Sequence, residues 1–148
     1  MNYKDGDVLL SMTNDGLDIN IKNNLIECTS GFETAIYLSL FGGNEKDDSS
    51  NSNEKYTWWG NNIQSIDYYK SNTLSIITGK NANARNLQLL EKAILLDLNW
   101  IIEQNIADTI EVNCTIPNFN ELEIQLKVLR DNKLISKSNY KTNWETVK

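Results

Sequence analysis

The chain has 148 residues, contains no histidine and carries a formal net charge of -6. This length is typical of a single domain, and the acidic balance argues against a nucleic-acid partner, whose phosphates are bound by clustered Lys and Arg. The amino end has no apolar signal core, and no apolar run approaches the ~20 residues of a membrane span. We therefore expect a protein of cytoplasm-like conditions with no membrane partner.

The charge is distributed unevenly along the chain. From Lys127 to the end there are six basic residues and two acidic ones, a net of +4, which leaves -10 for the first 126 residues. Two interpretations remain open: this is ordinary solvated surface, or unlike-charged ends of chains meet in an assembly.

The first elements expected are a hairpin and a helix. Apolar segments at 7–11 and 17–21 flank Thr13-Asn14-Asp15-Gly16, and Asp-Gly between such segments predicts a β-hairpin with one solvated face. Ser30 and Glu33 have the spacing of a capping box, which predicts a helix over about 31–41. Gly42-Gly43 would end it.

A polar stretch follows this helix. Residues 43–55 contain no large apolar side chain, so we expect a mobile loop. Trp58 and Trp59 come next, and adjacent side chains of an extended segment point to opposite sides. One Trp would then anchor the loop against the core and the other would be free to contact a partner or a neighbouring helix, although both could belong to the core. Farther on, Leu74–Ile77 fits either a helical turn or a strand.

The strongest pattern predicts a central helix over about 84–104, capped near 83–86. One face repeats apolar residues at three- and four-residue spacing, and a second set widens it: Leu87, Leu90, Ile94, Leu98 and Ile101, with Leu89, Ala93, Leu96 and Trp100. A helix this apolar is expected to be wrapped by other elements, leaving water only the stripe near Gln88, Lys92, Asn99 and Glu103.

Two alternating segments after this helix predict strands. Residues 110–116 and 122–128 each show one apolar and one polar face, and the only proline, Pro117, lies in the connection. Asp131-Asn132 favours a tight turn into Leu134-Ile135. The chain is therefore predicted to be one α+β domain (1–148) of mostly antiparallel sheet, with hairpins packed on the central helix and a C-terminal hairpin and tail at 121–148. Trp144 would dock on this chain or on another.

The sequence offers little sign of catalysis. Without histidine, Ser-His-Asp and Cys-His arrangements cannot form, and no phosphate-binding glycine pattern is present. Cys28 and Cys114 lie among apolar residues, which favours buried thiols, while a disulfide between them stays open. Five carboxylates are candidates for catalytic pairs, but their positions on the predicted helix and strands favour solvated charges: Glu91, Asp97, Glu103, Asp108 and Glu111. Asp47-Asp48 lacks the ligand order of a calcium loop, so no metal or cofactor is expected.

The order of these parts resembles a known family. The segments that carry the resemblance are Phe32-Glu-Thr-Ala-Ile-Tyr-Leu-Ser-Leu-Phe41, Trp58-Trp59-Gly60-Asn61 and Leu95–Val112. Together they resemble the small baseplate protein of Mu-like contractile-tailed phages, over roughly residues 3 to 130. Asn61 stands where the family has Asp, Asn105 where it has Gly, and residues 65–83 depart further.

The resemblance implies a baseplate wedge component, similar to the sheath initiator that bears a lysozyme-like name without an established hydrolase role. Such proteins join other wedge proteins and sheath subunits by pairing strands across chains, in a virion or a tail-like bacteriocin. The amphipathic, basic hairpin from Leu122 to Tyr140 would provide an edge strand for this contact. The predicted partner-interface residues are Trp58, Trp59, Leu122, Ile124, Lys127, Arg130, Lys133, Leu134, Ile135, Tyr140 and Trp144.

Two other classes of function remain open. The acidic first 126 residues suit a small binding module such as an immunity or inhibitor protein, and an enzyme that works without histidine is the third class. On the structural reading, deletion from Leu134 onward should leave a folded protein that cannot assemble.

Overall fold

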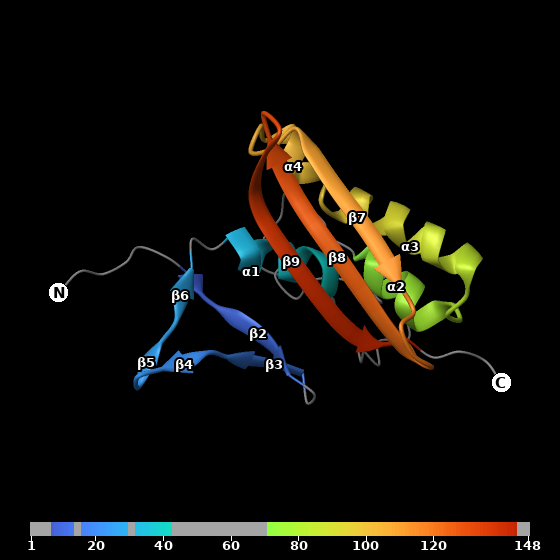
Figure 1. Cartoon of the computed structure of the whole chain (residues 1–148), viewed down its shortest axis with the longest axis horizontal. Helices are drawn as coiled ribbons and strands as arrows, with labels where there is room; N and C mark the ends of the chain where they lie inside the picture. Colours follow the sequence, from blue (N-terminus) through green and yellow to red (C-terminus); the bar gives the residue numbers. More distant parts are fainter. Residues whose placement is uncertain (1–6, 14–15, 30–31, 43–70, 145–148) are drawn as a thin grey trace, which may run out of the picture.

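The computed structural model describes residues 7–13, 16–29, 32–42 and 71–144. They form an α+β domain, as predicted, in which a three-stranded antiparallel sheet of order β7-β8-β9 is backed by helices, and short strands form an N-terminal ribbon (Figure 1). The elements are β1 (Asp7–Val8), β2 (Leu10–Thr13), β3 (Gly16–Ile19), β4 (Ile21–Lys22), β5 (Leu25–Ile26), β6 (Cys28–Thr29), α1 (Phe32–Phe41), α2 (Asn72–Gly79), α3 (Ala84–Asp97), α4 (Asn99–Glu103), β7 (Thr109–Thr115), β8 (Glu121–Arg130) and β9 (Lys133–Asn143).

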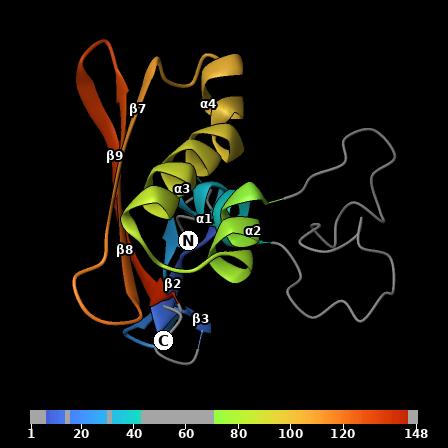
Figure 2. The same ribbon diagram turned by 90° about the vertical axis from the view of Figure 1, so that its right-hand side faces the viewer.

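The core lies between the sheet and the helices. Figure 2 shows the sheet almost edge-on with the helices on one side. Alternate residues of β8 point toward α3 and α4, so the predicted two-faced strands are confirmed. The fully or almost fully buried residues of this core are Leu122, Ile124, Leu126 and Val128 from the sheet and Leu90, Ile94, Leu98 and Ile101 from the helices. Each such side chain contributes about 1.5–3 kcal/mol by leaving water.

The predicted central helix is two helices that meet at Leu98. Asn83 caps α3 by accepting a hydrogen bond from the Asn86 amide at 2.9 Å, where the sequence placed the cap. Most of the predicted apolar residues are enclosed: Leu90, Ala93, Ile94, Leu98 and Ile101 are buried, and Leu87 and Trp100 are partly buried. The expectation is wrong for Leu89 and Leu96, which are 36% and 67% exposed. The sheet covers one side of the helix only, so the wider face extends past it.

Local side-chain contacts set the ends of α1 and α2. The amide of Gly42 donates to the Leu38 carbonyl, and a Cβ at position 42 would overlap that carbonyl, so glycine is needed for this close approach. Ser71 caps α2, since its hydroxyl accepts from the Leu74 amide at 3.0 Å. The same hydroxyl donates to the Leu40 carbonyl at 2.6 Å and joins the two helices. The ambiguous segment 74–77 is therefore helical.

The N-terminal ribbon contains the predicted hairpin. Met12 pairs with Leu17 and Leu10 with Ile19, and β1–β6 and β4–β5 extend the ribbon on either side. One hydrogen bond joins the ribbon to α1: the Thr34 hydroxyl donates to the Val8 carbonyl, at 2.9 Å. The ribbon was expected to have one solvated face only. That expectation is wrong, because the apolar side chains of its outer part are exposed: Ile19, Ile21, Leu25 and Ile26.

The two cysteines have different environments. Cys114 is buried in β7, as predicted, whereas the prediction is wrong for Cys28, which is exposed in β6 of the ribbon. Both are free thiols, so the open question of a disulfide is answered in the negative. The predicted loop at 43–55, Trp58, Trp59, Ser30 and Gly43 lie outside the described residues.

Candidate interaction surface

The end of the β8–β9 hairpin collects five of the residues predicted to contact a partner. All are exposed or partly so, and they surround one tight turn: Lys127, Arg130, Lys133, Leu134 and Ile135. Asp131 and Asn132 form this turn with φ angles of 50° and 60°, a pair of left-handed residues that matches a type I′ hairpin. The sequence signal for this turn is thus confirmed.

A β-bulge places two apolar side chains beside these cations. Val128 pairs with Ser136 and Leu129 with Leu134, so Ile135 is an extra residue in β9. The bulge leaves Leu134 and Ile135 54% and 45% exposed. We call the segment from Lys127 to Lys137 the hairpin end.

Four predicted interface residues belong instead to the core of this chain. Leu122 and Ile124 are fully buried, Tyr140 packs edge-on against the rings of Tyr37 and Phe41, and Trp144 is fully buried. The indole N–H of Trp144 donates to the Lys80 carbonyl at 2.6 Å. Their assignment to a partner surface is corrected, since the inward face of the sheet and the helices enclose these side chains. Trp58 and Trp59 lie outside the described residues.

The two edges of the sheet differ. At the β7 edge, the amide of Cys114 donates to the Glu91 carboxylate of α3 at 3.0 Å. The Glu91 carboxylate thus accepts the hydrogen bond that a backbone carbonyl of a further strand would otherwise accept. At the other edge, β9 pairs only with β8 among the described strands.

The alternation of hydrogen bonds along β9 identifies which of its backbone N–H and C=O groups point outward. The amide of Trp144 donates to the Asn120 carbonyl at 3.0 Å, which continues the β8–β9 ladder. Because bonded and non-bonded pairs alternate along an antiparallel ladder, the even-numbered residues of this part of β9 bond to β8. The backbone groups of four residues consequently point away from the sheet: Lys137, Asn139, Lys141 and Asn143.

The uncovered face of the sheet is polar. Lys127 pairs with Glu111 at 3.5 Å and lies directly opposite Lys137. Farther along, the side-chain amide of Asn139 donates to the Glu123 carboxylate at 2.7 Å. That hydrogen bond, with a smaller effect from Lys141, lowers the pKa of Glu123. This face can thus stay in water while the edge or the hairpin end makes a contact.

The candidate carboxylates have structural contacts. Asp97 was interpreted as solvated, but it is buried and accepts hydrogen bonds from the amides of Asn72 and Thr73 at 3.0 and 2.8 Å. Burial raises its pKa, and these hydrogen bonds oppose part of the rise. The sequence contained the signal, since Asp97 follows Leu90, Ala93 and Ile94 at helical spacing and so shares their buried face.

The other four carboxylates lie at the surface or at element ends. Glu91 binds β7 as described, Asp108 accepts from the Asp131 amide at 2.8 Å, Glu103 accepts from Asn99 at 2.6 Å, and Glu111 pairs with Lys127. Within the described ranges, no three His, Cys, Asp or Glu side chains gather where a metal could bind. Asp47 and Asp48 are not among them. No described helix has the length and apolar character of a membrane span.

These features define an α+β protein with a sheet edge, β9, to which no further described strand pairs, and a basic, partly apolar hairpin end. The family described as "Phage protein GP46" matches residues 32–134, from the start of α1 to the start of β9. The chain belongs to this phage protein family. No curated protein and no solved structure matches the chain.

Proposed function

We propose that the chain is a non-catalytic structural component of a contractile-tail baseplate, a wedge protein that links the baseplate to the first ring of sheath subunits. Its membership in a phage protein family and its resemblance to the small baseplate protein of Mu-like phages support this role. The protein would be made in the cytoplasm of the producing cell and assembled into a virion or tail-like particle. The role needs no cofactor.

The observation that carries the proposal is the outer edge of β9, to which no other strand of the described part of the chain pairs. Its outward-pointing residues, from Lys137 to Asn143, span about 20 Å of strand. A strand from a sheath subunit or a wedge protein that adds here makes backbone hydrogen bonds, each with a net contribution of about 0.5–1.5 kcal/mol. The opposite edge is less suitable because Glu91 occupies the amide of Cys114.

The test must leave the core intact. Deletion from Leu134 onward would remove buried Tyr140 and Trp144, so the structure contradicts the expectation that this truncation folds. Asn139→Pro is more suitable, because proline removes a backbone N–H that points away from β8 and is tolerated at such an edge position. Asn139→Ala is the matched control, since it removes the same side chain and keeps the backbone N–H.

Both variants would replace the wild-type protein in a producing strain, with particles purified and examined for sheathed tails. We expect Asn139→Ala to give assembled tails and Asn139→Pro to give baseplates without sheath, while both purified proteins keep the wild-type circular dichroism spectrum. Assembled tails from Asn139→Pro would refute strand addition at β9. Absence of the wild-type protein from baseplates would refute the structural role and favour the acidic binding module.

A further inference from the structure

A row of charged side chains crosses the uncovered face of the sheet and ends in a lysine at its outer edge. Glu111, Lys127 and Lys137 lie in register on β7, β8 and β9. The Glu111 carboxylate lies 3.5 Å from the Lys127 ammonium, so these two charges offset each other. Lys137 adds a second cation to the row, at the edge where we propose that a further strand binds.

The two lysines of this row face each other at close spacing. Because the even-numbered residues of this part of β9 bond to β8, Lys127 and Lys137 form a non-hydrogen-bonded pair, whose Cα atoms are about 4.5 Å apart. Like charges directly opposite each other destabilise a sheet. The neighbouring positions on this face, Gln125 of β8 and Asn139 of β9, carry no charge that could offset the repulsion.

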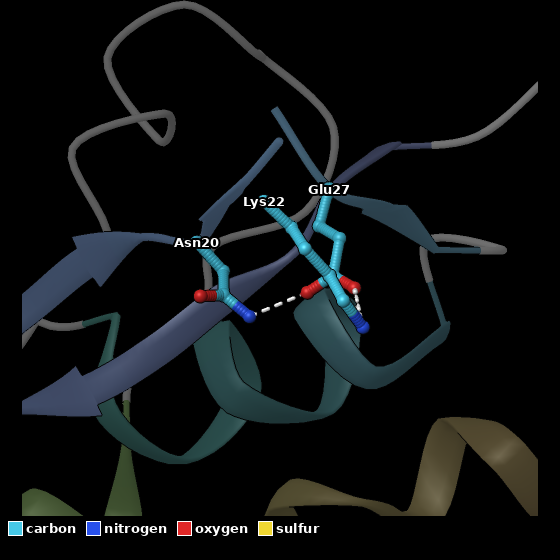
Figure 3. A network of polar contacts seen from close by, with 3 residues as sticks. All are labelled: Asn20, Lys22 and Glu27. Atoms are coloured by element: carbon cyan, nitrogen blue, oxygen red, sulfur yellow. Dashed lines mark hydrogen bonds and ion pairs between the residues drawn. The ribbon is translucent and has the colours of Figure 1, made fainter. Parts of the chain in front are cut away.

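A lysine of the N-terminal ribbon has the contact that Lys137 lacks. Figure 3 shows the Glu27 carboxylate between two side chains: it accepts a hydrogen bond from the side-chain amide of Asn20 and lies 3.8 Å from the Lys22 ammonium. Lys22 and Lys127 thus each face a carboxylate of their own chain. Among the ion pairs of the described residues, none includes Lys137.

The backbone of Lys137 determines where a partner side chain would lie. Its N–H and C=O point away from the sheet, so one residue of an added antiparallel strand would exchange both hydrogen bonds with it, at a Cα separation of about 5.5 Å. The side chain of that residue would project from the same face as Lys137. This face is open, with a hollow of about 470 Å³ whose lining includes Lys127 and Lys137.

We propose that the strand that adds to β9 carries an Asp or Glu opposite Lys137, so that the row continues with a carboxylate of another tail protein. This inference rests on the proposed function, because it specifies the partner strand at the same edge. The carboxylate offsets the repulsion between the two lysines, in a segment (127–137) with four basic side chains and one acidic one.

The charge contact and the backbone contact have different roles. Backbone hydrogen bonds give an added strand most of its affinity, and they depend little on its sequence. A charge at the rim of an interface acts mainly on the rate of association and on the rejection of wrong partners. Lys137 is therefore a specificity-determining residue: it favours an acidic strand and disfavours a basic one.

Carbodiimide treatment of purified tail particles tests the contact directly. This reagent joins an amine and a neighbouring carboxylate into an amide, with loss of water. Mass spectrometry of the digested particles should identify a peptide in which the Nζ of Lys137 is linked to an Asp or Glu of a sheath subunit or another wedge protein. Lys137→Arg is the control, since it keeps the charge and should give assembled tails without this link. Absence of the link from wild-type particles, or its formation only with this same chain, would overturn the inference.

Charge reversal in the producing strain provides a second measurement. Lys137→Glu should lower the yield of sheathed tails by about tenfold, and Lys137→Gln should lower it less. Lys92→Glu, on the exposed surface of α3, makes the same change in net charge and should assemble like the wild type. Because Lys137→Glu also removes the repulsion with Lys127, the purified variant should unfold at a urea concentration no lower than the wild type does. A wild-type yield from Lys137→Glu, or an equal loss from Lys92→Glu, would contradict the acidic partner.

Failure of this inference is distinguishable from failure of the proposed function. If Asn139→Pro blocks assembly while Lys137→Glu does not, strand addition stands and only the acidic partner is refuted. If Asn139→Pro gives sheathed tails, strand addition at β9 is itself refuted.

Discussion

Trp144→Ala should destabilise the protein strongly, although Trp144 lies near the end of the chain. Its side chain is fully buried, and its indole N–H donates to the Lys80 carbonyl after α2. The sequence left open whether Trp144 docks on this chain or on a partner. The change in the free energy of unfolding therefore measures a contact that only the tertiary structure assigns.

The expected magnitude follows from burial. A buried Trp removes about 150–250 Å² from water, which at about 25 cal/mol per Å² corresponds to about 4–6 kcal/mol. Partial relaxation of the side chains around the vacated space lowers the expected loss to about 4 kcal/mol, within the usual range for Trp→Ala. Trp144→Phe retains most of the apolar contact and loses the hydrogen bond, so we expect about 1–2 kcal/mol.

Urea unfolding followed by far-ultraviolet circular dichroism provides the measurement. With a slope of about 2 kcal/mol per M, a loss of about 4 kcal/mol lowers the midpoint by about 2 M. Leu134→Ala, on the exposed hairpin end, is the control and should change the free energy by less than about 0.5 kcal/mol. A midpoint shift below about 0.5 M for Trp144→Ala would refute the assignment of this side chain to the core.

Two further predictions concern Asp97 and the thiols. Because burial raises the pKa of Asp97, folding favours its protonated form, and this contribution to stability is lost as pH rises from 3.8 through the raised pKa. Asp97→Asn should flatten this pH dependence of the free energy of unfolding in urea titrations and cost about 1–3 kcal/mol through weaker capping of α2. A pH profile that the substitution leaves unchanged would contradict the burial argument. Exposed Cys28 should react with a thiol reagent in the folded protein. Cys114 is buried, and burial raises its pKa to about 12, so it should react only after unfolding. Equal reaction rates of the two thiols in the folded protein would contradict the difference in exposure.

Much of the fold could be predicted because its signals are local. The alternation in 122–128, the cap at Asn83 and the Asp131-Asn132 turn each depend on residues close in sequence, and each is confirmed. Exposure was harder to predict. Leu89 and Leu96 have the apolar character of core residues, and the positions of the sheet and helices leave them at the surface.

For the candidate interaction surface, too, some features follow from the sequence and others only from the tertiary structure. From sequence alone came the basic, amphipathic character of the last hairpin and the residues at its end, because charge and periodicity are read directly from the chain. Only the tertiary structure decided that Tyr140 and Trp144 are core residues, that Asp97 caps a helix distant in sequence, and that apolar residues of the N-terminal ribbon such as Ile21 lie exposed. The physical reason is that burial is a property of what surrounds a residue in space, and for these residues the surrounding groups come from remote parts of the chain.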